Sequence, residues 1–331
     1  MIMACKSWRS IAGVWLGIMV GLLGGEAMSA QVPASSPNSA AKNHSKAATK
    51  KQPESYTLVG AGDIAWCANL SGAEATAKLI DQILGTVFAP GDLAYEDGTY
   101  EEFQNCYQPT WGRFKARTRP APGNHEYDGR QAGGYFRYWG AQAGDPQKGY
   151  YSYDLGAWHI VVLNTNCGVK VLGGCNEGSP EEVWLKKDLA EHPNACIVAY
   201  GHHILFSSGL FSAHARHSNL RPFWRDLYAA HADLILGGHE HSYERFAPQD
   251  PDGHNDPEHG IREIVVGTGG KSHTPLGFAQ SNSEVRNDDT FGVLKLTLGP
   301  RKYTWEFVPE AGMTFRDSGT GTCHNQTEAS K

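Results

Sequence analysis

The chain has 331 residues, of which 40% are apolar and 19% are charged, and its formal net charge is −6. This composition excludes an intrinsically disordered or collagen-like chain. The mild acidity argues against a dedicated nucleic-acid binder, which would carry an excess of basic residues.

Residues 1–30 have the pattern of a signal peptide. Lys6 and Arg9 precede an apolar run over residues 11–24, and small residues follow at Ala27, Ser29 and Ala30. The run is short for a membrane span, so we expect cleavage, export to the periplasm or the exterior, and no stable membrane insertion afterwards. An uncleaved membrane anchor is the alternative.

The rest of the chain divides into three expected parts. Residues 31–54 are polar and contain almost no large apolar side chain, which is typical of a flexible linker. Residues 55–310 carry the apolar patterns of a folded catalytic domain, and residues 311–331 form a tail rich in Gly, Ser and Thr.

Strand patterns alternate with helical patterns in the folded part. Ser71 and Ser179 are the expected caps of helices over 71–83 and 180–191, and a third helix is expected over 222–230. The early alternation followed by later strands favours a mixed α/β fold. Apolar runs predict strands at 56–61, 86–89, 150–154, 158–163, 197–200, 234–236, 264–267, 291–298 and 303–308.

A polar cluster that begins with glycine follows several of these strands. Each cluster alone reads as an ordinary turn. Together they predict a metal site, because ligands of α/β sheets gather at the carboxyl ends of strands and because carboxylate, phenol, amide and imidazole groups suit iron, manganese and zinc. The clusters are Gly62-Asp63, Gly91-Asp92-Leu93-Ala94-Tyr95, Gly123-Asn124-His125-Glu126, Gly201-His202-His203 and Gly237-Gly238-His239-Glu240-His241.

The motifs GDLAY, GNHE, the His-His pair and GHEHSYER resemble those of the calcineurin-like metallophosphoesterases, and within them the purple acid phosphatases. The resemblance implies two packed mixed β-sheets flanked by helices, with two metal ions at the sheet edge. Two positions depart from the pattern, since Ala65 stands for a usual Gly and Ile204 for a usual Pro. Neither change removes a donor atom.

Carried over by position, the resemblance implies seven metal ligands. Asp63, Tyr95 and His241 resemble the ligands of the first metal, and Asn124, His202 and His239 those of the second. Asp92 resembles the carboxylate that bridges the two ions. A phenolate ligand favours Fe(III) at the first position, beside a divalent Zn, Fe or Mn ion. If Tyr95 is only a packed aromatic residue, both ions would be divalent.

His125, His203 and His214 are the histidines expected to contact the substrate. His125 resembles a residue that binds phosphate or protonates the leaving alkoxide, although it could instead orient Asp92 or a ligand. His203 lies beside a ligand, but consecutive strand residues point to opposite faces, which favours a supporting role. His214 and His217 could guard the pocket or lie on the surface without a role.

These inferences predict an exported phosphatase that hydrolyses small phosphate monoesters by attack of a metal-bound hydroxide. A phosphodiesterase acting on nucleotides or glycerophosphodiesters is the first alternative. A non-catalytic surface or binding protein on the same fold is the second. The intact set of seven candidate ligands favours an enzyme. The oligomeric state is left open by the sequence.

Six cysteines lie beyond the signal and fit three disulfides in an oxidising compartment. Cys167 and Cys175 are close enough in sequence to close a local loop. Cys67 follows Asp63 on the metal side, and we expect it to pair with Cys106. Cys196 begins a strand that ends at the metal side, so it should lie at the opposite edge and pair with Cys323.

Overall fold

The computed structural model describes residues 55–193, 195–210 and 217–324. The predicted signal, the whole predicted linker (31–54) and His214 lie outside these residues. No helix in the described ranges is long and apolar enough to cross a membrane.

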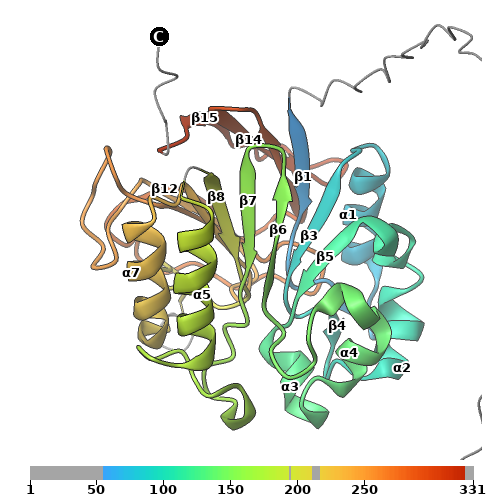
Figure 1. The fold of residues 1–331 in the computed structure, drawn as a ribbon. Helices are drawn as coiled ribbons and strands as arrows, with labels where there is room; N and C mark the ends of the chain where they lie inside the picture. The colour runs from blue at the N-terminus through green and yellow to red at the C-terminus, as the bar shows by residue number, and fades with distance from the viewer. Residues whose placement is uncertain (1–54, 194, 211–216, 325–331) are drawn as a thin grey trace, which may run out of the picture. The chain divides into compact units, whose positions relative to one another are not determined.

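Two large sheets form the centre of the fold (Figure 1). One has six strands in the order β15-β14-β13-β1-β3-β5, and the other has seven in the order β12-β10-β11-β9-β8-β7-β6. The strands of the first sheet are β1 (Tyr56–Gly60), β3 (Thr86–Pro90), β5 (Thr118–Ala121), β13 (Gly292–Leu298), β14 (Lys302–Pro309) and β15 (Ser318–Thr322). Those of the second are β6 (Tyr151–Leu155), β7 (Trp158–Val162), β8 (Cys196–Tyr200), β9 (Leu234–Gly237), β10 (Tyr243–Phe246), β11 (Arg262–Val266) and β12 (Ser283–Asn287).

Both sheets are mixed, as the sequence predicts. Strands β1, β3 and β5 run parallel, whereas β13, β14 and β15 are antiparallel. In the second sheet β7, β8, β9 and β11 run parallel and the outer strands pair antiparallel. A small parallel pair, β2 (Ala65–Trp66) and β4 (Ala94–Tyr95), is formed by the segments that follow β1 and β3 of the first sheet.

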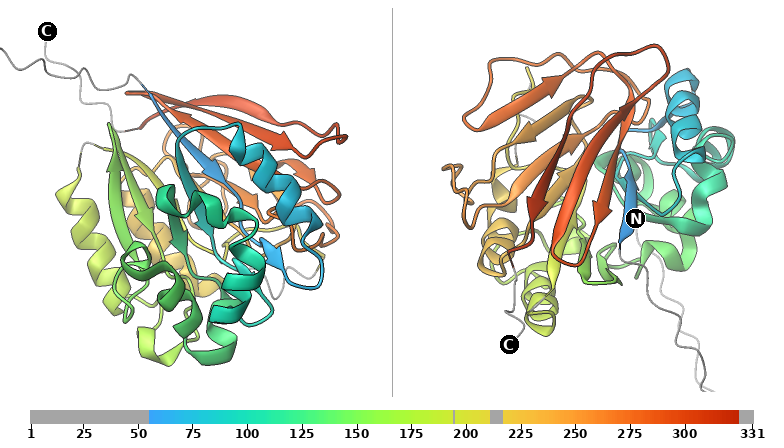
Figure 2. Two further views of the ribbon diagram at one scale, coloured as in Figure 1. Left: turned by 90° about the vertical axis from the view of Figure 1, so that its right-hand side faces the viewer. Right: turned by 90° about the horizontal axis from the view of Figure 1, so that it is seen from above.

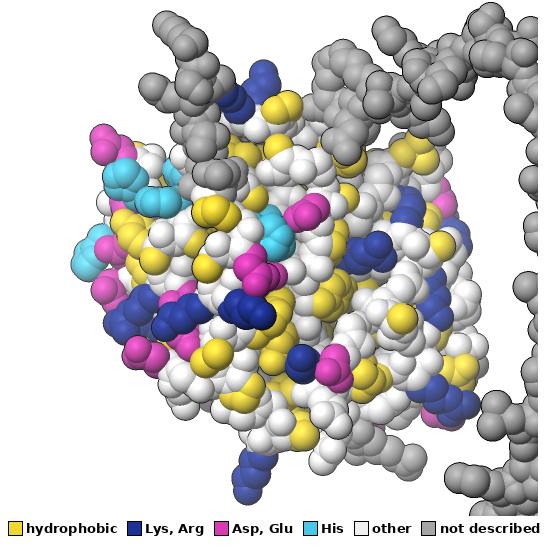
Figure 3. All heavy atoms as spheres, in the orientation of Figure 1, with side chains coloured by type: hydrophobic (Ala, Val, Ile, Leu, Met, Phe, Trp, Pro, Cys, Tyr) yellow, Lys and Arg dark blue, Asp and Glu magenta, His cyan; other side chains and the backbone are white. Residues whose placement is uncertain are grey.

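Helices cover the outer faces of the sandwich (Figures 1 and 2). α5 (Pro180–Glu191) and α7 (Arg221–Ala229) lie against the seven-stranded sheet, and α1 (Ser71–Asp81) lies on the other side. The short α2 (Tyr100–Glu102), α3 (Asn124–Arg130) and α4 (Gly133–Trp139) cluster at one end. On the face that carries α5 and α7, acidic and basic side chains are interspersed (Figure 3), as in the ion pair between Lys186 and Glu182.

Strand β8 shows how the alternation of side chains builds the two core layers. Cys196, Val198 and Tyr200 pack in the cluster between the sheets, whereas Ile197 and Ala199 pack in the cluster under α5 and α7. Both faces are therefore buried, which explains the continuous apolar run in the sequence. Continuing the alternation past Tyr200 directs His202 toward the six-stranded sheet.

The helix caps agree with the sequence in one case and differ in another. Ser179 caps α5 and accepts a hydrogen bond from the Glu182 backbone, with Pro180 at the first position. Ser71 is not a cap: Leu70 occupies that position, and the side chain of Asn69 accepts the hydrogen bond from the Ser71 backbone. Asn69 supplies the acceptor in place of Ser71, because Asn side chains in turns commonly accept a hydrogen bond from the backbone two residues further on.

Strand β15 extends the six-stranded sheet beyond residue 310, where the sequence indicated a polar tail. The sequence of β15 does not show the alternation of apolar residues that indicates a strand, because Gly319 and Gly321 stand at the positions of one face. A Cβ at Gly319 would lie 2.1 Å from the Trp305 ring, and one at Gly321 would lie 2.2 Å from the Tyr303 ring. Glycine thus allows the last strand to lie directly on two aromatic rings.

Candidate metal centre

Loops that follow strands of both sheets bring the predicted ligands to one end of the sandwich. The six-stranded sheet contributes loops after β1, β3 and β5, and the seven-stranded sheet contributes loops after β8 and β9. All seven predicted ligand side chains lie in hydrogen-bonding contact within this set. They are Asp63, Asp92, Tyr95, Asn124, His202, His239 and His241.

The backbone is strained where three of these residues sit. Asp63, Asp92 and His239 have φ angles of +59°, +52° and +70°, values that non-glycine residues rarely adopt. Such strain persists where the surrounding structure fixes it, and it is frequent at functional sites. Close approach adds a second constraint, because a Cβ at Gly123 would lie 2.1 Å from Oδ1 of Asp92.

The first group of side chains surrounds the Tyr95 hydroxyl. This hydroxyl donates to Oδ1 of Asp63 at 2.8 Å and lies 3.2 Å from Oδ2 of Asp92. Nε2 of His241 lies 3.2 Å from the hydroxyl and 3.2 Å from Oδ1 of Asp63. Nδ1 of His241 is held by the Ser272 hydroxyl at 2.7 Å, which fixes the direction of Nε2.

The second group surrounds Nε2 of His202. Oδ2 of Asp92, Oδ1 of Asn124 and Nδ1 of His239 each lie 3.1 Å from this nitrogen. Oδ2 of Asp92 therefore reaches both the Tyr95 group and the His202 group. A carboxylate between two sets of donors is the arrangement required of a bridge between two ions.

The second group has more acceptors than donors. Nδ1 of His202 donates to the Pro90 carbonyl at 2.9 Å, so a neutral ring presents a lone pair at Nε2. That lone pair faces a carboxylate oxygen and an amide oxygen, and only a cation or a proton can satisfy all three. Burial lowers the pKa of His202, but the charges of Asp92 and Asp63 outweigh it and raise the pKa to about 9. The same position suits a divalent ion.

The surroundings of the first group disfavour ionisation of the Tyr95 phenol. Burial, followed by the charges of Asp63 and Asp92, raises the pKa of Tyr95 well above 10. The phenol therefore ionises only beside a strongly charged cation. The donor set of two carboxylates, a phenol and an imidazole fits a hard metal ion that would supply this charge.

Glu126 fastens the ligand loops together, a role the sequence reasoning did not assign. Its buried carboxylate accepts hydrogen bonds from the backbone of Asp92 (2.9 Å), Leu93 (2.8 Å) and Gly123 (2.7 Å). Burial raises the pKa of Glu126 to about 7. Its place as the fourth residue of GNHE was the available signal, since a Glu three residues after a helix cap returns to the cap backbone.

The histidines expected to contact substrate divide into different settings. His125 lies at the rim, with 28% of its side chain exposed, Nε2 3.8 Å from Oδ2 of Asp92 and Nδ1 held by the Glu96 carbonyl at 2.5 Å. His203 is buried and its Nδ1 contacts the Thr165 hydroxyl at 3.0 Å. His214 lies outside the described residues.

His217 is closer to the centre than the sequence reasoning assumed. Its ring centroid lies 4.1 Å from that of His203 and 5.3 Å from that of His239. Nε2 of His217 is buried without a hydrogen-bond partner in the described part of the chain. Burial and then the charge of His202 lower the pKa of His217 to about 4, so its ring is neutral. The His203-His217-His239 arrangement has no signal in local sequence, because it brings together residues that are far apart in the chain.

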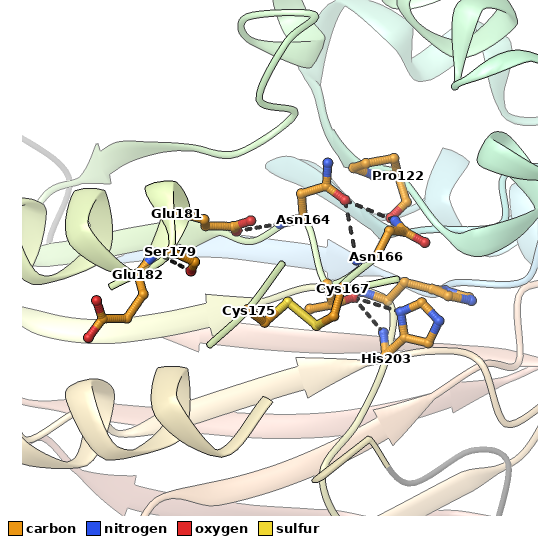
Figure 4. The surroundings of a disulfide bond; sticks show 11 residues. Pro122, Asn164, Asn166, Cys167, Cys175, Ser179, Glu181, Glu182 and His203 are labelled. Carbon is orange, nitrogen blue, oxygen red and sulfur yellow. Dashed lines mark hydrogen bonds between the residues drawn. A yellow bond between two sulfur atoms is a disulfide. The ribbon is translucent and has the colours of Figure 1, made fainter. Parts of the chain in front are cut away.

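The loop after β7 contacts ligand-bearing loops of both sheets, and Figure 4 shows its disulfide and the hydrogen bond from Asn166 to Pro122. The Thr165 hydroxyl accepts from the backbone of His202 at 3.1 Å and of His203 at 2.8 Å. The Asn166 amide donates to the Pro122 carbonyl at 3.2 Å, next to the Gly123 loop of the other sheet. The disulfide between Cys167 and Cys175 closes the same loop.

All three predicted disulfides are confirmed. Cys67 pairs with Cys106, Cys167 with Cys175, and Cys196 with Cys323. The reasoning from strand ends holds because Cys196 begins β8 at the edge opposite to His202.

The two departures from the family motif leave the ligands in place. Ala65 pairs with Ala94 in the small parallel sheet, beside Asp63. Ile204 is 1% exposed and packs with Phe246 and Val265. A Cβ at Gly237 would lie 2.2 Å from the Ile204 side chain, so the loop after β9 accommodates the branched residue with a glycine.

Comparison with known proteins agrees with this geometry. A family model described as calcineurin-like phosphoesterase matches residues 56–243. Purple acid phosphatase 15 of Arabidopsis thaliana is 26% identical in an alignment of 241 residues. The match covers 61% of this chain and 43% of that protein. The chain spans less than half the length of the curated relatives it matches.

Solved structures share the fold. The purple acid phosphatase PPD1 from yellow lupin (Lupinus luteus) seeds superposes with a TM-score of 0.61 at 21% identity, over 81% of this chain and 54% of that chain. GAP50, the anchor in the inner membrane complex of Plasmodium, superposes with a TM-score of 0.62 at 15% identity, over 82% of this chain and 90% of that one. The predicted sandwich of two mixed sheets with flanking helices is therefore confirmed.

Proposed function

The chain belongs to the calcineurin-like phosphoesterase family, and from this premise we propose that it hydrolyses phosphate monoesters at a centre of two metal ions. Asp63, Tyr95 and His241 would hold the first ion. Asn124, His202 and His239 would hold the second. Asp92 would bridge them. The observation that carries the proposal is Oδ2 of Asp92, which lies 3.2 Å from the Tyr95 hydroxyl and 3.1 Å from Nε2 of His202.

Two bound ions would supply a water nucleophile near neutral pH and neutralise the phosphate charge. The protein's own groups determine how the substrate is placed. His125 lies beside Asp92, and His217, whose Nε2 has no hydrogen-bond partner among the described residues, lies beside the rings of His203 and His239; we assign both histidines to the phosphate oxygens. His125 is also the group that can give a proton to the leaving alcohol.

His203 has a different proposed role. Thr165 holds its Nδ1, and its ring lies 4.6 Å from the ring of His239. We propose that it supports His239 and the pocket wall, and that the direct phosphate contact on this side belongs to His217.

The first metal is proposed to be Fe(III) and the second a divalent Zn, Fe or Mn ion, because the hard phenol and carboxylate donors gather at the first position. The test is elemental analysis of the purified protein together with turnover of a monoester and a diester chromogenic substrate. We expect two metal ions per chain and faster monoester turnover. Faster diester turnover would favour a phosphodiesterase, and a metal-free, inactive protein would favour a binding role.

Tyr95 gives the first test of an individual ligand. A phenolate bound to Fe(III) absorbs visible light by charge transfer, so the iron-loaded protein should be violet to pink and Tyr95→Phe should lose the band. The measurement is the visible spectrum at matched iron content. An unchanged band in Tyr95→Phe would remove Tyr95 from the ligand set and leave six donors for two divalent ions.

Export is a separate proposal that rests on two observations. The pattern of residues 1–30 is that of a signal peptide, and the domain carries three disulfides. Mass determination of the N-terminus of the exported protein tests it, with cleavage expected close to Ala30.

A further inference from the structure

A lysine lies against the proposed Tyr95 ligand. In the small sheet, Trp66 of β2 is paired in register with Tyr95 of β4, so the two rings are neighbours. Nζ of Lys271 lies 4.1 Å from the centroid of the Trp66 ring and 4.6 Å from that of Tyr95. Cations at these distances from aromatic faces are attracted by the ring quadrupole.

The backbone fixes Lys271 at this place. Its amide donates to the Asp63 carbonyl at 2.9 Å, in the loop that also carries a proposed ligand. Only 13% of the Lys271 side chain is exposed. The position of the ammonium group is therefore set by the same loop that sets Asp63, and the group is largely removed from water.

The partner of Lys271 does not cancel its charge at the ring. Nζ bonds Oε1 of Glu96 at 2.5 Å, and Glu96 also accepts a hydrogen bond from the Trp66 side chain. The Glu96 side chain is 55% exposed, so solvent screens the carboxylate more than the ammonium. Lys271 thus adds a positive contribution at the face of Tyr95, whose hydroxyl is bonded to the Asp63 carboxylate.

We infer that Lys271 is a positioning residue that tunes Tyr95 as a metal ligand by placing a positive charge over its ring. The inference rests on the proposed function, in which Tyr95 binds the first ion. A nearby cation stabilises the anionic phenolate and lowers the energy of its π electrons. The phenol then ionises more readily, and the phenolate gives up electron density less readily.

The visible spectrum reports this effect directly. Charge transfer moves an electron from the phenolate to Fe(III), so a cation over the ring raises the energy of the transition. Lys271→Met should therefore shift the band of the iron-loaded protein to longer wavelength at unchanged iron content. Lys271→Arg keeps the charge and should keep the band close to that of the wild type.

The chain offers a matched control. Nζ of Lys115 lies 4.2 Å from the Tyr138 ring centroid, a similar contact outside the proposed metal centre. Lys115→Met should leave the band unchanged. Thermal unfolding and iron content of each variant show that a shifted band does not come from a misfolded or partly loaded protein.

The outcomes separate this inference from the function beneath it. A wild-type band that disappears in Tyr95→Phe and stays unchanged in Lys271→Met overturns the role of Lys271 alone. An iron-loaded wild type without a visible band, or a protein that takes up no iron, overturns the Tyr95 assignment and the Lys271 role together. A shift of equal size in Lys115→Met also overturns the role of Lys271.

Discussion

Two clusters of histidines and carboxylates differ in how their nitrogens are satisfied. In the first, which lies at the outer strands β6 and β7, His159 is 1% exposed, its Nδ1 lies 2.8 Å from Asp154 and its Nε2 2.8 Å from Asp188. A protonated imidazole satisfies both carboxylates there. At the candidate metal centre, by contrast, one nitrogen, Nε2 of His202, meets both Oδ2 of Asp92 and Oδ1 of Asn124 at 3.1 Å, so a single proton there would have to be shared between two acceptors.

Ring geometry separates the clusters as well. His192 stacks on His159 with centroids 3.7 Å apart and an interplanar angle of 15°. Two parallel rings cannot both direct an in-plane lone pair at one ion. The rings of His202 and His239 cross at 79°, which allows their nitrogens to converge. Proximity of His and Asp therefore does not define a metal site; the directions of the lone pairs do.

The largest expected effect comes from breaking the metal centre. Asp92→Asn replaces the shared carboxylate with a neutral amide and should lower turnover by at least about 100-fold and reduce bound metal, since losing even a supporting partner costs about 10–100-fold. Asp188→Asn in the His159 cluster is the control and should keep both ions. Near-normal turnover in a fully metallated Asp92→Asn protein would contradict the bridging role.

A smaller effect is expected behind the ligands. Thr165→Val keeps the side-chain shape but removes the hydroxyl that accepts from His202 and His203. We expect metal affinity to fall by about 10-fold. Thr165→Ser restores the acceptor and should recover most of the affinity. Metal titration distinguishes this role from a general loss of stability, which would lower the unfolding midpoint without changing the affinity of the folded protein.

The smallest effect is expected in the His159 cluster, where a substitution should lower the stability of the protein but leave its activity unchanged. His159→Phe leaves the buried Asp188 carboxylate without its partner and should cost about 1–3 kcal/mol of unfolding free energy. Turnover and metal content should stay at wild-type values. A loss of metal in this variant would mean that the two clusters are not independent.

The same cost should depend on pH with a definite sign. Burial lowers the pKa of His159, but the hydrogen bonds that its ring donates to the Asp188 and Asp154 carboxylates outweigh burial and raise the pKa above its ordinary value. Its stabilisation is therefore complete below about pH 6.5 and is lost as pH rises through the folded pKa. Unfolding by denaturant should show a larger gap between wild type and His159→Phe at pH 5 than at pH 9. Equal gaps would refute the ion pair.

The sequence predicts the strands, and the candidate ligand side chains that gather at their ends, better than it predicts the residues that support them. Asp63 and Asp92 follow β1 and β3, which are parallel neighbours in one sheet, so their strand order brings them together. His202 follows β8 of the other sheet and reaches them because the two sheets pack together. Thr165 and Lys271 act across contacts between distant segments, and no local pattern distinguishes them from ordinary polar residues. Glu126 did have a local signal, its place three residues after the helix cap Gly123. The sequence does not indicate strand β15 for a different reason. Two of its residues are glycines because they lie directly against the rings of Trp305 and Tyr303.

The disulfide between Cys196 and Cys323 has a mechanical consequence. Cys196 begins β8 of the seven-stranded sheet, and Cys323 follows β15 of the six-stranded sheet, so the bond joins the two sheets at one end. The candidate ligands come from both sheets at the other end. Ions bound there would act as a second fastening, and β8, which runs from Cys196 toward His202, would be held at both ends. Separating the two sheets would then require both connections to break. The connection through the metal ions is the one that a chelator can remove.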